Sequence, residues 1–239
     1  MHALHLFGST QSPFYYELSK MYAAAVLRPA GTRHSFVAVQ PDGAWRLGPA
    51  PDDLGPAVPM HEGLARLPEA DLVVPHMFCR AGMTSYRALM EDLVGLPLVG
   101  APAAVAGLAT SKSWTRDVVA AAGVPVARGE RLDGGTCPTL AVPFVVKPDS
   151  EDNSLGVSVV RSADEIDAAL AHARRYDDVL LAEDFIPGRE IRVAVVETGG
   201  DLLVPAFMEY PVSEARPIRE VADKLETGSD GTAMRQSRR

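Results

Sequence analysis

Residues 143–157 constrain the fold of this chain more than any other stretch. The β-branched run after Phe144 predicts a buried strand that ends in Lys147, with Pro148 stopping the pairing. A short polar turn then leads to a second apolar strand at Val157. This arrangement suits a polyphosphate, because the lysine supplies positive charge and the turn can aim backbone N–H groups at phosphate oxygens. An ordinary β-hairpin with a surface lysine is the alternative interpretation.

The composition favours a globular protein without a nucleic-acid partner. The 239 residues are 47% hydrophobic, and the mean hydropathy is +0.03. A net charge of −8 argues against binding to nucleic acid, which needs a basic face. Two cysteines, Cys79 and Cys137, predict neither a disulfide framework nor a zinc site. No apolar run reaches the length of a membrane span, so we expect a cytoplasmic protein with no membrane partner.

The first hundred residues alternate between strand and helix patterns. The predicted elements are strands at 3–7, 35–40, 70–77 and 98–100 and helices at 13–27 and 84–94. Ser12 and Pro13 are a capping residue and a first-turn proline for the first helix, and 48–60 is expected to be loop. This alternation predicts a parallel α/β domain over 1–101.

The rest of the chain has a different, α+β pattern. Its predicted elements are a helix at 111–122, the Lys147 hairpin, a capping box at 162–165 before another helix, and strands at 179–185 and 191–197. The pattern weakens after Leu203, and 226–239 is expected to be disordered or a mobile loop.

The order of features around Lys147 resembles a known family. Lys112 opens a helix, Lys147 precedes a small-residue loop, a strand ends in Glu183-Asp-Phe-Ile, and Gly-Arg-Glu190 follows. This series resembles the ATP-grasp fold of the D-alanine–D-alanine ligase family. The resemblance implies an α/β chain with three parts: an N-terminal domain at 1–101, a central ATP-grasp subdomain at 102–182, and part of a C-terminal subdomain with a mobile tail at 183–239.

The resemblance also implies a role for each matching residue. Catalytic roles fall to Lys147 and Lys224, and ATP-binding roles to Lys112, Lys147, Ser150, Asn153, Ser154, Gly156, Glu183, Asp184, Phe185, Ile186, Glu190 and Lys224. The two earlier lysines would hold phosphates, 150–156 would close over them, 183–186 would meet adenine, Glu190 would bind the ribose, and Lys224 would approach the γ-phosphate. Core packing is the alternative role for Phe185 and Ile186, and a salt bridge with Arg189 or Arg192 is the alternative for Glu190.

The implied chemistry is ATP-dependent amide formation. A carboxylate attacks the γ-phosphate, an acyl phosphate forms, and an amine displaces phosphate, with catalysis supplied by positioning and charge neutralisation by lysines and Mg²⁺. The expected partners are therefore ATP, a carboxylate and an amino acid, and a homodimer is considered. His76 and Cys79 are interpreted as a strand end near the cleft, not as catalytic groups.

Two departures from the D-alanine ligase pattern point to a narrower branch. A Gly-Glu-Asp-Gly pattern is absent, and the phosphate loop carries acids where the family has a Gly-Ser-Ser-like run. Segments 76–87, 152–156, 209–210, 217–219 and 222–225 are similar to the ligase of mycosporine-like amino acid biosynthesis, which joins mycosporine-glycine to serine or threonine. A D-alanine-type dipeptide ligase is the alternative.

The substrate and metal sites are less defined. The acceptor pocket is predicted from five residues at one strand end, Phe78, Arg80, Thr84, Tyr86 and Arg87. The family's magnesium ligands are expected C-terminal to Lys224, and no metal ligand is assigned in this chain. A non-catalytic nucleotide-binding remnant is therefore a further alternative.

Overall fold

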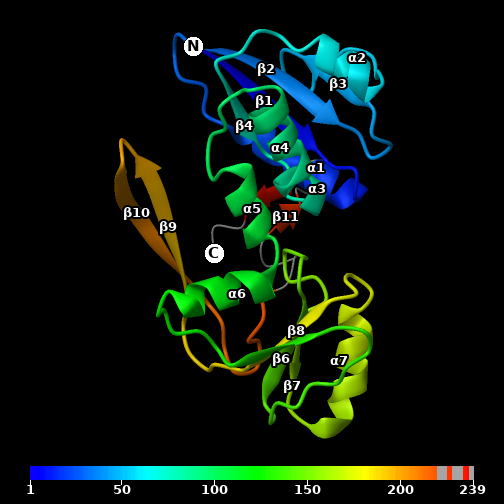
Figure 1. Cartoon of the computed structure of the whole chain (residues 1–239), viewed down its shortest axis with the longest axis vertical. Helices are drawn as coiled ribbons and strands as arrows, with labels where there is room; N and C mark the ends of the chain where they lie inside the picture. Colours follow the sequence, from blue (N-terminus) through cyan, green and yellow to red (C-terminus); the bar gives the residue numbers. More distant parts are fainter. Residues whose placement is uncertain (220–224, 228–233, 237–239) are drawn as a thin grey trace. The chain divides into compact units, whose positions relative to one another are not determined.

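The computed structural model describes residues 1–219, 225–227 and 234–236 (Figure 1). Contacts within the chain divide it into two compact units. Unit 1 contains Met1–Val124 and Ser150–Asp152, whereas unit 2 contains Pro125–Asp149 and the described residues from Asn153 to Arg219. This division differs from the predicted domain ranges, because the segment 103–124 has its contacts in unit 1.

Unit 1 is built on a four-stranded sheet in the order β3-β2-β1-β4. Its strands are β1 (His2–Gly8), β2 (Arg33–Val39), β3 (Trp45–Gly48) and β4 (Leu72–Pro75). β1 pairs in parallel with both β2 and β4, and β3 is an antiparallel edge strand. The parallel α/β pattern predicted for this half is confirmed, but β3 was not predicted. Residues 98–100 contribute only an isolated bridge between Val73 and Leu98 instead of the predicted strand.

The helices of unit 1 are short apart from two. They are α1 (Pro13–Ala25), α2 (Met60–Ala65), α3 (Arg80–Met83), α4 (Ser85–Ala88), the π-helical η1 (Leu89–Leu93), α5 (Ala103–Ala109) and α6 (Lys112–Ala121). The Ser12 side chain caps α1 by accepting from the N–H of Tyr15, as predicted. The predicted helix at 84–94 is divided, since residues Leu89–Leu93 are π-helical, and Leu93 is 79% exposed. Within the described residues, no helix has the length and apolar character that a membrane crossing needs.

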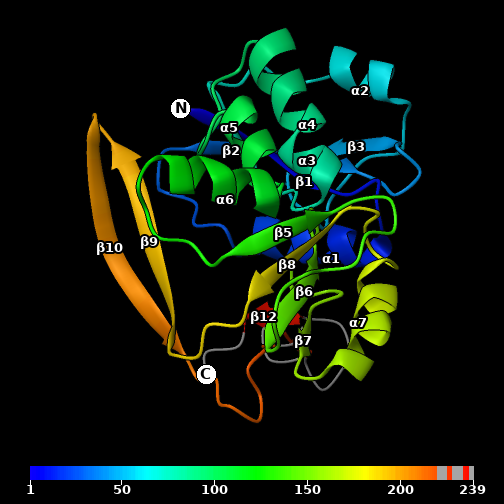
Figure 2. The same cartoon turned by 60° about the horizontal axis from the view of Figure 1, so that its bottom comes forward.

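Unit 2 contains an antiparallel sheet in the order β5-β8-β6-β7 (Figure 2). The strands are β5 (Gly129–Leu132), β6 (Phe144–Pro148), β7 (Ser158–Val160) and β8 (Leu180–Asp184). β6 and β7 form the predicted hairpin, and β8 pairs with β6 on its other side. Pro148 does not stop the pairing as expected, since β6 remains in register with β8 as far as Pro148 and Leu180. The next residue, Asp149, donates its N–H to the Val179 carbonyl at 3.0 Å.

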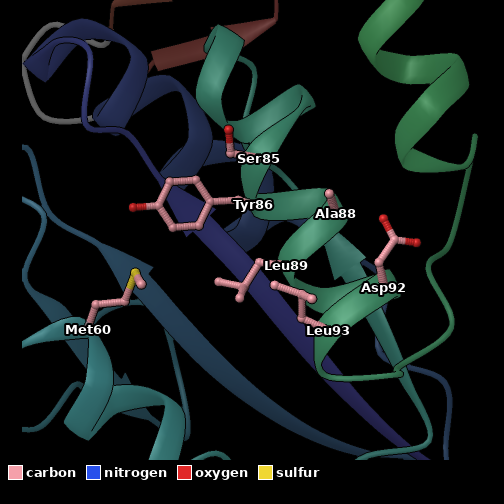
Figure 3. A pocket seen from close by; sticks show the side chains of 7 residues that line it. All are labelled: Met60, Ser85, Tyr86, Ala88, Leu89, Asp92 and Leu93. Atoms are coloured by element: carbon pink, nitrogen blue, oxygen red, sulfur yellow. The ribbon is translucent and has the colours of Figure 1, made fainter.

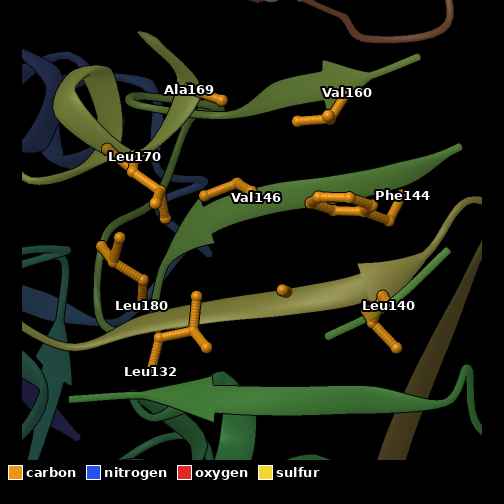
Figure 4. Packing of buried hydrophobic residues seen from close by; sticks show 10 residues of the cluster. Leu132, Leu140, Phe144, Val146, Val160, Ala169, Leu170 and Leu180 are labelled. Atoms are coloured by element: carbon orange, nitrogen blue, oxygen red, sulfur yellow. The ribbon is translucent and has the colours of Figure 1, made fainter. Parts of the chain in front are cut away.

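One face of this sheet and helix α7 (Ile166–Ala173) enclose an apolar core (Figure 4). The core residues are Leu132, Leu140, Phe144, Val146, Val160, Ala169, Leu170, Ala173, Leu180 and Ala182. Phe144, Val146 and Leu180 are fully buried, and the predicted apolar face of α7 supplies Ala169 and Leu170. This core fixes the face of the sheet on which each β6 and β8 side chain lies.

The predicted capping box at 162–165 does not form. Ser162 makes no side-chain cap hydrogen bond, and residues Ala163–Glu165 adopt a 3-10 turn, η2, before α7. The Glu165 carboxylate accepts from the N–H of Arg161 at 2.7 Å instead of from that of Ser162. The acid thus reaches back one residue further than the box requires.

The end of the described chain contains more strand than the sequence pattern indicated. β9 (Glu190–Thr198) and β10 (Asp201–Tyr210) form a two-stranded antiparallel ribbon, although the pattern weakens after Leu203. Apolar side chains on the ribbon are exposed, among them Phe207 at 75% and Leu202 at 71%. Within 226–239, expected to be disordered or a loop, the structure contains strand residues: β11 (Leu225–Thr227) pairs with β12 (Met234–Gln236).

Candidate functional site

Lys147 and Glu183 form an ion pair on the face of the unit 2 sheet that points away from α7. Side chains alternate along a strand, so Phe144 and Val146, which pack toward α7, leave Lys147 on the opposite face. The register places Lys147 across from Leu181, two positions from Glu183 on β8. The Lys147 Nζ contacts Glu183 Oε2, and the side chains are 23% and 16% exposed. The pair is therefore partly desolvated but still accessible to a ligand.

The turn between β6 and β7 places several backbone groups in the left-handed region. φ is +57° at Asn153, +62° at Ser154 and +71° at Gly156. A Cβ at Gly156 would lie 2.6 Å from Pro148 Cγ and 2.8 Å from Tyr176 Cδ2, so only glycine fits without displacement. Non-glycine residues in this region carry a conformational cost and are often found at ligand-binding loops. Two adjacent residues of this kind make the turn a candidate binding loop.

Asn153 also carries a buried donor that lacks a partner. Its Nδ2 is buried and makes no hydrogen bond to the described residues. An unpaired buried polar group costs on the order of 1–3 kcal/mol, and a ligand oxygen at this position would remove that cost. The phosphate-binding role of Asn153 stays a prediction, and this unpaired donor is compatible with it.

The segment that follows β8 lines a cavity of about 730 Å³ in unit 2. The lining residues are Phe185, Ile186, Pro187, Gly188, Arg189, Glu190, Val212, Ser213, Glu214 and Pro217. Phe185, Ile186 and Glu190 were predicted to meet adenine and ribose, so the structure brings three predicted residues to one cavity. The wall from Val212 to Pro217 was missed as a site, because it follows β10, a strand that the sequence pattern did not reveal.

Backbone hydrogen bonding distinguishes the residues of this segment. The N–H of Asp184 donates to the Arg128 carbonyl at 2.9 Å, and that of Phe185 donates to Pro143 at 3.2 Å. In the described part of the chain, the N–H of Ile186 has no backbone acceptor, and the residue is 68% exposed. The Ile186 N–H is therefore free to bind an acceptor atom, whereas the Asp184 N–H is not. The predicted contact of Asp184 with adenine is limited to its carbonyl oxygen.

Glu190 begins β9 opposite Tyr210 and is exposed. Its alternative role, a salt bridge with a neighbouring arginine, is not formed. Arg189 instead makes two hydrogen bonds to the Glu209 carboxylate, at 2.6 and 2.7 Å, and Arg192 lies over the Tyr210 ring at 5.2 Å. The Glu190 carboxylate is left at the cavity wall.

Lys112 and Ser150 belong to unit 1. Lys112 follows the α6 cap Ser111, and its Nζ donates to the Glu151 carbonyl. The Glu151 carboxylate accepts from Gln11 Nε2 at 2.8 Å and from the Tyr15 hydroxyl at 2.7 Å. Burial and this hydrogen bond raise the pKa of Tyr15. The Glu151 carboxylate, one of the acids in the predicted phosphate loop, is thus hydrogen-bonded to neutral donors. The sequence alone did not reveal these partners.

Several of the five residues predicted to form an acceptor pocket make contacts within unit 1. The Phe78 ring packs on Tyr22 at 4.7 Å between centroids, Thr84 Oγ1 donates to the Arg80 carbonyl, and Arg87 Nη1 donates to the Ala101 carbonyl at 3.0 Å. Arg87 is buried, and desolvation lowers its pKa. It therefore holds the following loop in place.

Of these five, Tyr86 lines a cavity of about 500 Å³ in unit 1 (Figure 3). The other lining residues are Met60, Ser85, Ala88, Leu89, Asp92 and Leu93. Burial raises the pKa of Tyr86, so its hydroxyl stays neutral, and its ring lies 6.2 Å from that of Trp45. The other four predicted residues do not line this cavity, and their role in an acceptor pocket stays a prediction.

One predicted site residue cannot be located. Lys224 lies outside the described residues. In the portion of the chain that the structure describes, no group of three or more His, Cys, Asp or Glu side chains could hold a metal ion.

Part of the chain matches a family model, and curated relatives also match part of the chain. Residues 128–215 match the model described as D-ala D-ala ligase C-terminus. A D-alanine–D-alanine ligase of Geobacter sulfurreducens is 38% identical over 129 residues, which are 52% of this chain and 40% of the relative. That of Gluconobacter oxydans is 31% identical over 149 residues, 61% of this chain and 49% of the relative. The matched segment thus covers less than half of the length of these relatives.

Solved structures extend the likeness across most of the chain. The D-alanine–D-alanine ligase of Coxiella burnetii superposes with a TM-score of 0.71 at 23% identity and covers 90% of this chain and 73% of that structure. The VanG D-Ala:D-Ser ligase of Enterococcus faecalis gives a TM-score of 0.72 at 21% identity, covering 87% and 69%. At this identity the likeness establishes the fold. Residues 128–215 therefore resemble the C-terminal part of D-alanine–D-alanine ligases, and the chain as a whole has the ATP-grasp fold of these ligases.

Proposed function

We propose that this chain binds ATP in unit 2 as part of a ligase that joins the carboxylate of one D-alanine-type amino acid to the amine of another. The observation that carries the proposal is the Lys147–Glu183 pair. Its lysine precedes the turn with the unpaired Asn153 amide, and its glutamate precedes the segment that lines the 730 Å³ cavity. The lysine, the Asn153 amide donor and the cavity-lining segment thus lie on or after two neighbouring strands, β6 and β8.

The residues of unit 2 fit the chemical groups of ATP. Lys147 and the Asn153 amide would hold phosphate oxygens, since both are donors and one is charged. The unpaired N–H of Ile186 would donate to an adenine ring nitrogen, and the Glu183 carboxylate would accept from the adenine amine. Glu190 would bind ribose hydroxyls from the cavity wall.

Binding of ATP would require the ion pair to exchange partners. Lys147 would turn its charge toward phosphate, while Glu183 would gain an N–H donor in place of the ammonium. Both groups keep a partner before and after binding, so neither is left unpaired in a partly desolvated site, a state that is strongly unfavourable. The pair would hold both side chains in place before the ligand arrives.

ATP supplies the phosphoryl group that activates the carboxylate, and the amine then displaces phosphate. The protein's own contribution is to position the reacting groups and to neutralise charge, for which a lysine is suited. Magnesium is proposed together with ATP, but no step is assigned to it.

The comparisons favour a D-alanine-type substrate pair over mycosporine-glycine, because the matched relatives are D-alanine–D-alanine ligases. The mycosporine-type branch is the narrower second candidate. The observation in its favour is the acidic loop, in which Glu151 is held by Gln11 and Tyr15 instead of being replaced by a small residue. Product identity separates the two candidates.

Two measurements test the proposal. Isothermal titration with ATP should give saturable binding to the chain, and a phosphate-release assay should respond to D-alanine. Binding without turnover would support the nucleotide site and reject the ligase activity of this chain. Phosphate release with mycosporine-glycine and serine, but not with D-alanine, would reverse the preference between the two candidates.

A further inference from the structure

Three histidines of unit 1 form a continuous hydrogen-bonded chain across the parallel sheet. His34 Nδ1 and His5 Nε2 are 2.8 Å apart, and His5 Nδ1 and His76 Nε2 are 3.0 Å apart. The rings stack, with centroids separated by 5.1 and 5.3 Å. His5 lies on the central strand β1, His34 on β2, and His76 directly after β4. The chain therefore runs from one side of β1 to the other.

A threonine at one end fixes the direction of every hydrogen bond in this chain. Thr32 Oγ1 lies 2.6 Å from the Pro29 carbonyl, which can only accept, so the threonine proton is committed there. The same oxygen lies 2.6 Å from His34 Nε2, and it must therefore accept from that nitrogen.

The tautomers of the three rings follow from this one commitment. A neutral imidazole has one N–H donor and one acceptor nitrogen. His34 donates through Nε2 and accepts at Nδ1 from His5, and His5 accepts at Nδ1 from His76 Nε2. Nδ1 of His76 is left as an acceptor. It has no hydrogen-bond partner among the described residues and is not among their buried unpaired atoms, so solvent reaches it.

The surroundings keep the three histidine rings neutral at ordinary pH. Burial, followed by the influence of His76, His34 and Arg28, lowers the pKa of His5 to about 3, and burial lowers the pKa of His76 to about 4. Burial, Arg28 and His2 lower the pKa of His34. His34 is the half-buried end, whereas His5 is 1% exposed, so a positive charge is least costly on His34.

We propose that His76 Nδ1 takes the proton that the amine of an amino-acid substrate loses, and that the chain carries the resulting charge to His34. This proposal rests on the ligase function proposed above. In open α/β sheets, ligands bind outside the carboxyl ends of the strands, where His76 follows β4. A lone pair at that position accepts from an amine and repels the oxygens of a carboxylate or phosphate.

The proton balance of this step is closed within the three rings. As His76 Nδ1 gains a proton, its Nε2 proton moves to His5 Nδ1, and the His5 Nε2 proton moves to His34 Nδ1. His5 and His76 end as neutral Nδ1–H tautomers, and His34 ends as the imidazolium that donates to both His5 and Thr32. His76 would act as a catalytic residue, and His5 and His34 would act as positioning residues through it.

Two-bond ¹H–¹⁵N correlation spectra of the full chain, with histidines assigned, test the relay without any need for turnover. At pH 7 all three rings should be neutral Nε2–H tautomers, and on acidification His76 should change to Nδ1–H as His34 becomes charged. His34→Asn retains an acceptor near the Nδ1 position but holds no charge, so the pH 7 tautomers should persist and the acid-induced change should vanish. An Nδ1–H His76 at pH 7, or a His34 that titrates without changing His76, would overturn the proposal.

Activity provides the second arm. With D-alanine and ATP, His34→Asn should lower kcat about tenfold and change its pH profile while the affinity for ATP is unchanged. The exposed His61→Asn is the matched control and should leave the spectra and kcat unaltered. Thr32→Val replaces the terminal hydroxyl with a methyl group and should give mixed tautomers of the three histidines. This variant provides the test if a histidine variant fails to fold. An unchanged pH profile of kcat in His34→Asn would reject the relay. Absence of ATP binding by the unaltered protein would instead reject the ligase proposal, and the spectra alone would then decide on the relay.

Discussion

The two four-stranded sheets of this chain place polar side chains in opposite ways. On the antiparallel sheet of unit 2, Lys147 and Glu183 keep full charges at a face that solvent still reaches. On the parallel sheet of unit 1, His5 is 1% exposed and linked to two other neutral rings. Charge is retained where exchange with a charged ligand is feasible, and it is avoided where the polar group lies within the core.

This contrast distinguishes two roles of polar groups in one protein, the exchange of charged partners and the transfer of protons. An ion pair of two long side chains can change partners, so it suits a ligand that comes and goes. A chain of stacked imidazoles can rearrange only its protons, because its heavy atoms are held by the sheet. The predictions below test whether the two sheets are as different as their contacts indicate.

The largest expected effect comes from removing one fully buried ring from each sheet. Phe144→Ala and Phe36→Ala should each lower the free energy of unfolding by about 3–5 kcal/mol, because both rings are 0% exposed and leave cavities. Chemical denaturation measures the loss. Only Phe36→Ala should also perturb His5, on which Phe36 stacks at 4.6 Å. Phe207→Ala, on the exposed ribbon, is the matched control and should change stability by less than about 0.5 kcal/mol.

The next effect concerns the ion pair. Lys147→Met should weaken ATP binding about 100-fold, since the charge is lost while the aliphatic stem is kept. Isothermal titration measures the change, and Lys20→Met, whose lysine pairs with Asp52 on the surface of unit 1, is the control. Because Lys147→Met also leaves Glu183 unpaired, the double variant with Glu183→Gln should recover stability but not ATP affinity. Full affinity in Lys147→Met would remove the basis of the proposed nucleotide site.

Much of the fold could be predicted because it depends on local signals. Residues close together in sequence determine the start of α1 at Ser12-Pro13, the alternation of buried and exposed side chains along β6, and the apolar face of α7. The edge strands β3 and β5 and the ribbon strand β10 were missed, since their pairing partners are decided by tertiary contacts. The capping box failed for a similar reason: Glu165 found the Arg161 N–H instead of that of Ser162.

Only the order of the candidate site residues along the sequence could be predicted, not their contacts in space. The order of Lys147, Asn153, Glu183 and Ile186 was visible in sequence, and the structure places them on or directly after β6 and β8. The pairing of Lys147 with Glu183 depends on strand register, which the sequence does not state. The histidine chain was invisible, because it joins three strands that are separated by loops of different length.

A smaller effect is expected from the turn that follows Lys147. Gly156→Ala should destabilise the chain by about 1–3 kcal/mol, since φ is +71° and the new Cβ would clash with Pro148 and Tyr176. Gly134→Ala is the control, because φ is +58° there but no atom lies within 4 Å of the new Cβ. It should cost about 1 kcal/mol from backbone conformation alone. Equal losses in thermal unfolding would show that the packing around Gly156 is not tight.

The last effect is the pH dependence that the sheet of unit 1 should confer. The pKa of His5 falls from 6.5 to about 3 and that of His76 to about 4 in the folded chain, so the unfolded chain binds more protons between these values. The stabilisation is therefore complete well above pH 6.5 and is lost progressively as the pH falls toward 4 and then 3, by up to about 1.4 kcal/mol per pH unit for each ring.

Urea unfolding between pH 7.5 and 4.5 measures this slope. His5→Phe should reduce the slope, because it removes one of the rings whose pKa is lowered while preserving the stacked shape, whereas His61→Phe should leave it unchanged. A slope that survives His5→Phe would mean that acid acts elsewhere in the chain. The contrast between a sheet that carries charge and a sheet that excludes it would then need a different physical basis.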